Sequence, residues 1–87
     1  MPPAGLEVVG TVTAWYAHQQ AAAIKLSAPI RVGDAIYIRG FTTDFRHDVA
    51  SIQYQHRAVT EGKAGQVVGV AMPSRCRQRD GVYRLSP

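Results

Sequence analysis

The strongest constraint on the fold is a repeated alternation of apolar and polar residues in short runs that glycine and proline separate. Residues 35–39 show it most clearly, because Ile36 and Ile38 fall on one side and Tyr37 and Arg39 on the other. A period of two is that of a β-strand, and runs of this length are too short for stable helices. The sequence therefore predicts an all-β chain.

Six or seven short strands are expected. They cover residues 6–16, 21–26, 30–32, 35–39, 45–54, 66–72 and 82–85. The apolar side changes between Val49 and Ile52, which predicts a one-residue bulge near Ala50 or Ser51. Closure would remove the exposed edges of so small a sheet, so we predict a small closed antiparallel β-barrel. Its expected interior consists of apolar residues at alternating positions: Val12, Ile36, Ile38, Val49, Ile52, Val68 and Val70.

The chain of 87 residues is long enough for one small domain, which we place at residues 6–87 after a disordered tail at residues 1–5. Hydrophobic residues make up 46% of it, which favours a folded domain over a disordered segment. No apolar run is long enough to span a membrane, and the first residues do not have the pattern of a signal peptide. With one cysteine and thus no internal disulfide, the sequence predicts a cytoplasmic protein.

Basic residues gather near the C-terminal end. The chain contains ten Lys and Arg residues and six Asp and Glu residues, so its net charge is +4. If residues 75–79 are extended, Arg75, Arg77 and Arg79 form a row with a spacing of about 7 Å, which Arg84 joins. Guanidinium groups at this spacing favour an anionic partner, RNA or a ribonucleoprotein first, and the alternative is a solvated face.

The order of segments resembles the second domain of translation elongation factors, the β-barrel that follows the GTPase domain in elongation factor Tu. The segments that carry the resemblance are residues 10–13, 30–40, 49–54, 64–70 and 80–83. The chain is also similar to small free-standing translation-factor-like proteins and to the barrel appended to some collagenase-like peptidases.

The resemblance implies a non-catalytic barrel that binds RNA or a partner of the translation apparatus. Two departures limit it. A phosphate-binding loop of the form GxxxxGK[ST] is missing, so no nucleotide hydrolysis is expected, and the first hairpin, residues 14–23, is longer than in the elongation factor. We therefore transfer no tRNA-contacting residue to this chain.

No residue pattern indicates catalysis, a metal or a cofactor. His18, His47 and His56 are scattered singly, without a second ligand at metal-binding spacing. Cys76 alternates with Arg75 and Arg77, so on a strand it would face the core and be unreactive. We expect no enzyme activity from this chain.

Aromatic residues offer a different interpretation. Trp15, Tyr16 and Tyr37 are large side chains that could form a partner surface. The alternative function is therefore a protein-interaction module, accessory to a collagenase-like peptidase or to an RNA-modifying enzyme.

Overall fold

The computed structural model describes residues 5–85, which form ten strands and no helix. The strands are β1 (Leu6–Tyr16), β2 (Ala21–Leu26), β3 (Ile30–Arg31), β4 (Ala35–Arg39), β5 (Asp44–Asp48), β6 (Ile52–Tyr54), β7 (Arg57–Val59), β8 (Glu61–Gly62), β9 (Val67–Ala71) and β10 (Gly81–Leu85). Every strand pair is antiparallel. The all-β prediction is confirmed, and the expected tail lies, except for Gly5, outside the described residues.

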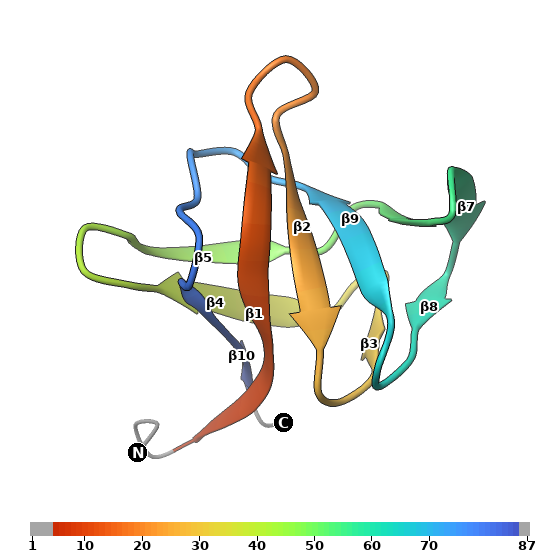
Figure 1. The fold of residues 1–87 in the computed structure, drawn as a ribbon. Coiled ribbons are helices and arrows are strands. Elements are labelled where there is room, and N and C mark those ends of the chain that lie inside the picture. Colours follow the sequence, from red (N-terminus) through yellow and green to blue (C-terminus); the bar gives the residue numbers. More distant parts are fainter. Residues whose placement is uncertain (1–4, 86–87) are drawn as a thin grey trace.

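Eight strands form one strongly curved sheet in the order β5-β4-β10-β1-β2-β9-β6-β7, and β3 and β8 form a second sheet (Figure 1). The first and last strands of the chain thus lie side by side, because β10 pairs between β1 and β4. In residues 5–85 no pairing joins β5 to β7, so neither sheet closes on itself. The closed barrel that the sequence predicts is therefore not confirmed.

The long strand β1 contains two irregularities that strict alternation does not show. Its register shifts between Val8 and Gly10 against β10, and between Val12 and Ala14 against β2. Because of the first shift, Val9 and Val12 are both buried although they are an odd number of residues apart. The shift therefore explains why apolar residues occur on both sides of this segment in the sequence.

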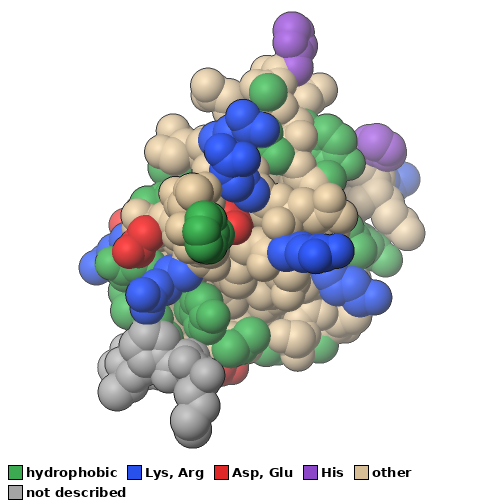
Figure 2. Space-filling view, turned by 60° about the vertical axis from the view of Figure 1, so that its left-hand side comes forward, with side chains coloured by type: hydrophobic (Ala, Val, Ile, Leu, Met, Phe, Trp, Pro, Cys, Tyr) green, Lys and Arg blue, Asp and Glu red, His purple; other side chains and the backbone are tan. Residues whose placement is uncertain are grey.

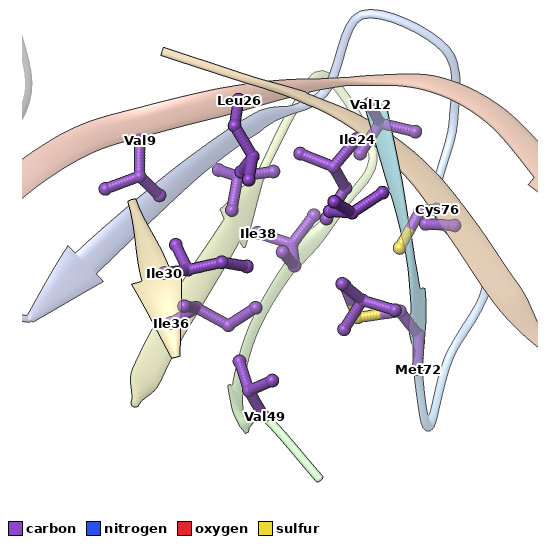
Figure 3. Packing of buried hydrophobic residues seen from close by; sticks show 14 of the residues in the cluster. Val9, Val12, Ile24, Leu26, Ile30, Ile36, Ile38, Val49, Met72 and Cys76 are labelled. Atoms are coloured by element: carbon purple, nitrogen blue, oxygen red, sulfur yellow. The ribbon is translucent and has the colours of Figure 1, made fainter. Parts of the chain in front are cut away.

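One continuous cluster of apolar side chains fills the interior (Figure 3). All seven predicted interior residues belong to it. The sequence analysis did not assign several further members of the cluster to the core: Val9, Ile24, Leu26, Ile30, Met72 and Val82. Burial of a side chain of this size contributes about 1.5–3 kcal/mol, so the cluster dominates the stability of the fold.

The expected strand over residues 45–54 is in fact two strands, β5 and β6, with a break at residues 49–51. Val49 continues from β5 by exchanging backbone hydrogen bonds with the preceding turn: its N–H donates to the Asp34 carbonyl, and its carbonyl accepts from the Gly33 N–H. The break, and not a one-residue bulge, lets Val49 and Ile52 both reach the core. Gly33 has a φ of 98°, a conformation that favours glycine.

Candidate interaction surfaces

A groove of about 530 Å³ lies on the outer side of β2, β9 and β6. Its lining comes from the β1–β2 hairpin, the start of β6, the β6–β7 turn and β9. The lining residues are Tyr16, Gln19, Ala21, Ala23, Ser51, Gln53, Gln55, His56, Val67, Val68, Gly69 and Ala71. The volume falls within the usual range of about 300–1,000 Å³ for ligand sites.

The floor of the groove is flat because small residues face one another across β2 and β9. Ala21 pairs with Ala71, and Ala23 pairs with Gly69. A Cβ atom added at Gly69 would meet nothing within 4 Å, which shows that the space above this position is open. A ligand could therefore approach the sheet backbone closely at this point.

The walls of the groove carry neutral polar groups. The amides of Gln19, Gln53 and Gln55 each offer a donor and an acceptor, and Ser51 adds a hydroxyl. None of the lining residues is a lysine, arginine, aspartate or glutamate. The groove is therefore suited to a neutral, hydrogen-bonding ligand and offers no countercharge for a phosphate.

A tight turn places one wall of the groove. Gln55 and His56 connect β6 to β7, and both have positive φ, at 52° and 65°. Two consecutive residues with positive φ define a type I′ turn, whose twist fits a two-residue β-hairpin. The turn positions His56 by backbone geometry, directly after the segment that the sequence analysis expected to be one strand, residues 45–54.

The predicted arginine row is not extended. Residues 75–77 have no regular structure, residues 78–79 form a turn, and Arg79 has a φ of 78°. The backbone N–H of Arg77 donates to Oδ2 of the buried Asp80 at 2.8 Å, which holds this loop in place. The strand-based spacing of Arg75, Arg77 and Arg79 is therefore wrong, although all three side chains are exposed. Their binding of an anion stays a prediction.

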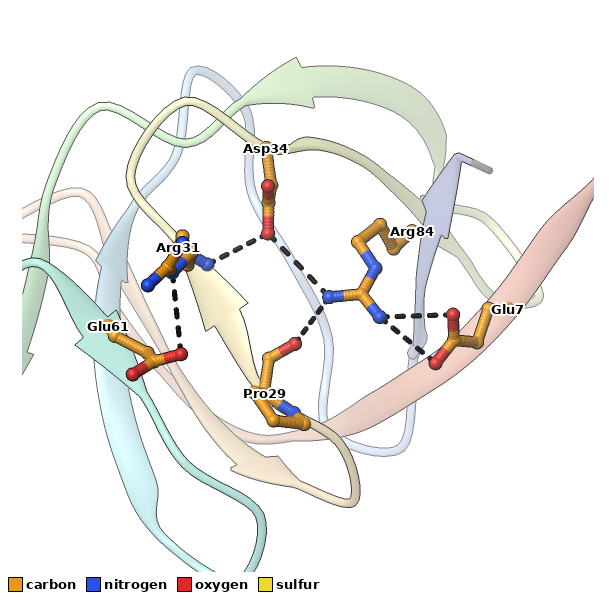
Figure 4. A network of polar contacts seen from close by, with 6 residues as sticks. All are labelled: Glu7, Pro29, Arg31, Asp34, Glu61 and Arg84. Atoms are coloured by element: carbon orange, nitrogen blue, oxygen red, sulfur yellow. Dashed lines mark hydrogen bonds and ion pairs between the residues drawn. The ribbon is translucent and has the colours of Figure 1, made fainter. Parts of the chain in front are cut away.

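Arg84 lies apart from this loop and is bound within the molecule (Figure 4). Its Nη2 donates to both carboxylate oxygens of Glu7 at 3.0 Å, and its Nη1 donates to the Pro29 carbonyl at 2.6 Å. The same Nη1 is 3.8 Å from Asp34 Oδ2. Arg84 thus connects β10 to β1, to the β2–β3 loop and to the β3–β4 turn, so its guanidinium group is engaged structurally.

The three aromatic residues predicted as a partner surface are not together. Trp15 is partly buried and packs against the core cluster. Tyr16 is 53% exposed and lines the groove. Tyr37 lies on β4, where it pairs with Tyr83 of β10, a pairing that the sequence analysis did not predict.

Cys76 is buried between the exposed Arg75 and Arg77, as predicted, although these residues are not part of a strand. It lies in the loop before β10 and packs in the core beside Met72 (Figure 3). Burial, and secondly the charge of Asp80, raises the pKa of the Cys76 thiol to about 11. The thiolate needed for nucleophilic attack is therefore disfavoured at neutral pH.

The histidines do not assemble a site. In residues 5–85, no group of three or more His, Cys, Asp and Glu side chains is placed to hold a metal ion. His18 and His56 are exposed on separate hairpins, and His47 is half-buried on β5. The described part of the chain therefore contains no arrangement that we can assign to metal-dependent or nucleophilic catalysis.

Comparison with known proteins relates the chain to proteases. It is 36% identical over 78 residues to a protein of Methanocaldococcus jannaschii named "Uncharacterized protease MJ0090". The match covers 88% of this chain but 19% of the relative, so this chain spans about a fifth of the relative's length. No protein-family model matches the sequence.

Two solved structures show the same fold. Both are described as the C-terminal domain of a U32 peptidase of Geobacillus thermoleovorans, one of them as its selenomethionine variant. They superpose with TM-scores of 0.84 and 0.83, at 15% identity, and cover 90% and 87% of this chain and 91% and 96% of theirs. The chain therefore has the fold of that C-terminal domain.

These matches correct the sequence-based resemblance. The elongation factor assignment is wrong, because the relative is named as a protease and the structural matches are peptidase domains. The likeness to a barrel appended to collagenase-like peptidases is the one that the comparisons support. Separately, residues 5–85 contain no helix that is long and apolar enough to cross a membrane.

Proposed function

We propose that this chain is a non-catalytic accessory module of a collagenase-like peptidase, and that its groove holds an extended, uncharged segment of polypeptide. The observation that carries the proposal is the 36% identity to a protein named as a protease, five times as long as the matched segment. The fold it shares with a U32 peptidase C-terminal domain supports the same context.

The accessory role is supported by the chemistry of the described residues. The one thiol is buried, with a pKa raised to about 11, and the histidines lie on separate elements. Hydrolysis of a peptide bond needs a nucleophile or an activated water next to an oriented base. We find no such pair to assign in residues 5–85, so the module contributes binding.

The polypeptide is supported by the form and polarity of the groove. A peptide backbone presents one donor and one acceptor per residue, which the amides of Gln19, Gln53 and Gln55 complement. The floor of Ala21, Ala71 and Gly69 leaves room for the chain itself. The absence of charged lining residues favours uncharged peptides over acidic or basic ones.

Gly69→Leu tests the groove directly, because a leucine there enters open space and fills it. The measurement is fluorescence anisotropy with terminally blocked eight-residue peptides: one series of Gly, Pro, Ala and Gln, and matched series carrying two Asp or two Lys. We expect the neutral series to bind most tightly and Gly69→Leu to weaken it at least about tenfold.

Ala58→Leu is the matched control, since Ala58 is exposed on β7 and does not line the groove. It adds the same side chain to the surface and should leave peptide binding unchanged. Equal binding by the wild-type protein and Gly69→Leu, or a preference for the charged series, would contradict the groove as the peptide site.

A further inference from the structure

We infer that a second surface, on the outer side of β4, β10 and β1, docks against the rest of the peptidase. The inference rests on the proposed function, which supplies the partner. We name this surface the aromatic face and define it by Val8, Tyr37, Phe41 and Tyr83. The groove belongs to β2, β9 and β6, so none of these four residues lines it.

The aromatic face is a cross-strand row that strand register brings together. Tyr37 is opposite Tyr83, and Tyr83 is opposite Val8, across β4, β10 and β1. Their neighbours Ile36, Ile38 and Val82 are buried, so the row faces outward. The three strands span about 10 Å, and β5 extends the surface by a further strand spacing of about 5 Å.

Gly81 lets Tyr83 lie against the sheet. A Cβ atom added at Gly81 would lie 3.0 Å from the Tyr83 ring, so the ring covers the position where a side chain would stand. Gly81 is opposite Thr11 on one side and Arg39 on the other. The surface beside the row is therefore flat, which suits contact with another folded protein.

Phe41 adds an exposed aromatic residue beyond the end of β4, in the loop that follows Gly40. It is fully exposed at the tip of the β4–β5 hairpin, which the 2.7 Å bond from the Gly40 N–H to the Thr43 carbonyl closes. Val8, at the β1 end of the row, is 45% exposed. Among residues 5–85 nothing covers the Phe41 side chain, and aromatic residues are enriched in protein interfaces.

Charges of both signs surround the aromatic face. Arg39 is opposite Asp44, and Arg46 next to Tyr37 is 3.7 Å from Asp48. Figure 2 shows the side of the molecule toward which the β4–β5 hairpin points, where hydrophobic side chains lie among basic and acidic ones. The carboxylates would repel the phosphates of a nucleic acid, whereas a mixed rim around aromatic residues matches a protein interface.

The length of the relative indicates which protein docks on the aromatic face. About four fifths of the Methanocaldococcus jannaschii protease lies outside the matched segment. Where two domains of one chain pack against each other, they do so through a surface of typically about 600–1,500 Å². We therefore assign the aromatic face to a complementary apolar pocket with a mixed-charge rim on that remainder.

The experiment measures binding of this chain to the remainder of the Methanocaldococcus jannaschii protease, expressed without its matched segment, by isothermal titration calorimetry. The variants are Phe41→Ser and Tyr37→Ser. The control is Val32→Ser, which removes an exposed hydrophobic residue that belongs to neither the groove nor the aromatic face. Circular dichroism confirms that each variant is folded.

We expect the wild-type chain to bind, Phe41→Ser and Tyr37→Ser to bind at least about tenfold more weakly, and Val32→Ser to bind within about twofold of wild type. Equal binding by all variants would overturn the docking surface. If the wild-type chain does not bind the remainder but still binds peptide, the docking surface is overturned. The groove then remains supported as the peptide site.

Failure of both docking and peptide binding would instead overturn the proposed function. A second titration uses a single-stranded RNA oligonucleotide at low salt. If the wild-type chain binds this RNA and the variants Phe41→Ser and Tyr37→Ser do not, the aromatic face is a nucleic-acid site. That result would overturn the inference.

Discussion

The groove and the aromatic face lie on the outer side of the same curved sheet, yet they differ in form and charge. The groove is hollow, has a floor of alanine and glycine and is lined by no lysine, arginine, aspartate or glutamate. The aromatic face is flat, carries Tyr37 and Tyr83, and has arginines and carboxylates beside it. This difference is the basis of our two proposals, an uncharged peptide in the groove and a folded partner protein on the aromatic face.

The largest expected effect on stability concerns the loop that leads into β10 and so into the aromatic face. Because the pKa of Cys76 is raised from 9.0 to about 11, the folded protein retains this proton at a pH where the unfolded chain has lost it. Its contribution to stability is thus complete below pH 9 and is lost as the pH rises through 9 to 11. The free energy of unfolding should decrease by about 2–3 kcal/mol in that window.

Urea unfolding at pH 8, 9, 10 and 11 measures this decrease, and Cys76→Ala is the reference that removes the thiol. The wild-type protein should lose more stability than Cys76→Ala over the window. Parallel pH curves for the two proteins would show that the thiol ionises as easily in the folded state as in the unfolded state.

The next effect separates Arg84, which is bound within the molecule, from Arg75, which lies in an exposed loop. Arg84→Gln removes the hydrogen bonds to both carboxylate oxygens of Glu7. The shorter glutamine side chain also loses the hydrogen bond to the Pro29 carbonyl. Because these groups are partly exposed, we expect a loss of about 1–2 kcal/mol in thermal or urea unfolding. Arg75→Gln, at an exposed loop position, should change stability by less than about 0.5 kcal/mol. Equal effects would contradict a structural role for Arg84.

The smallest effect compares one glycine from each surface. Gly81→Ala brings a Cβ within 3.0 Å of the Tyr83 ring and should cost about 1 kcal/mol, because the ring must shift. Gly69→Ala enters open space in a strand and should be neutral or stabilising by up to about 1 kcal/mol. Thermal unfolding of both variants gives the comparison, and a reversed order would show that the Tyr83 ring does not lie over Gly81.

Strand positions and core residues could be predicted from alternation, because Ile36, Ile38 and Val70 are buried by the period of two alone. Breaks in that period could not. The shift within β1 and the break at residues 49–51 depend on hydrogen bonds to distant segments, such as the one from the Val49 N–H to the Asp34 carbonyl. Local sequence carries no record of such long-range partners.

The surfaces were harder to predict than the core. The arginines of residues 75–79 are spaced as on a strand, but the loop is held by Asp80 and turns at Arg79. The pairing of Tyr37 with Tyr83 joins residues 46 positions apart. The groove is lined by residues of the β1–β2 hairpin, of β6 and its turn to β7, and of β9. Only Tyr16 and Tyr37 of the proposed surface residues were identified beforehand, from their size and type.

The central claim, a non-catalytic accessory module of a peptidase, is tested most directly by measuring cleavage of gelatin. Three samples are compared: this chain alone, the remainder of the Methanocaldococcus jannaschii protease alone, and the two together. We predict that the chain alone releases no peptides and that it increases the rate of release by the remainder. Cleavage by the chain alone, or a rate for the mixture no greater than that of the remainder, would contradict the account.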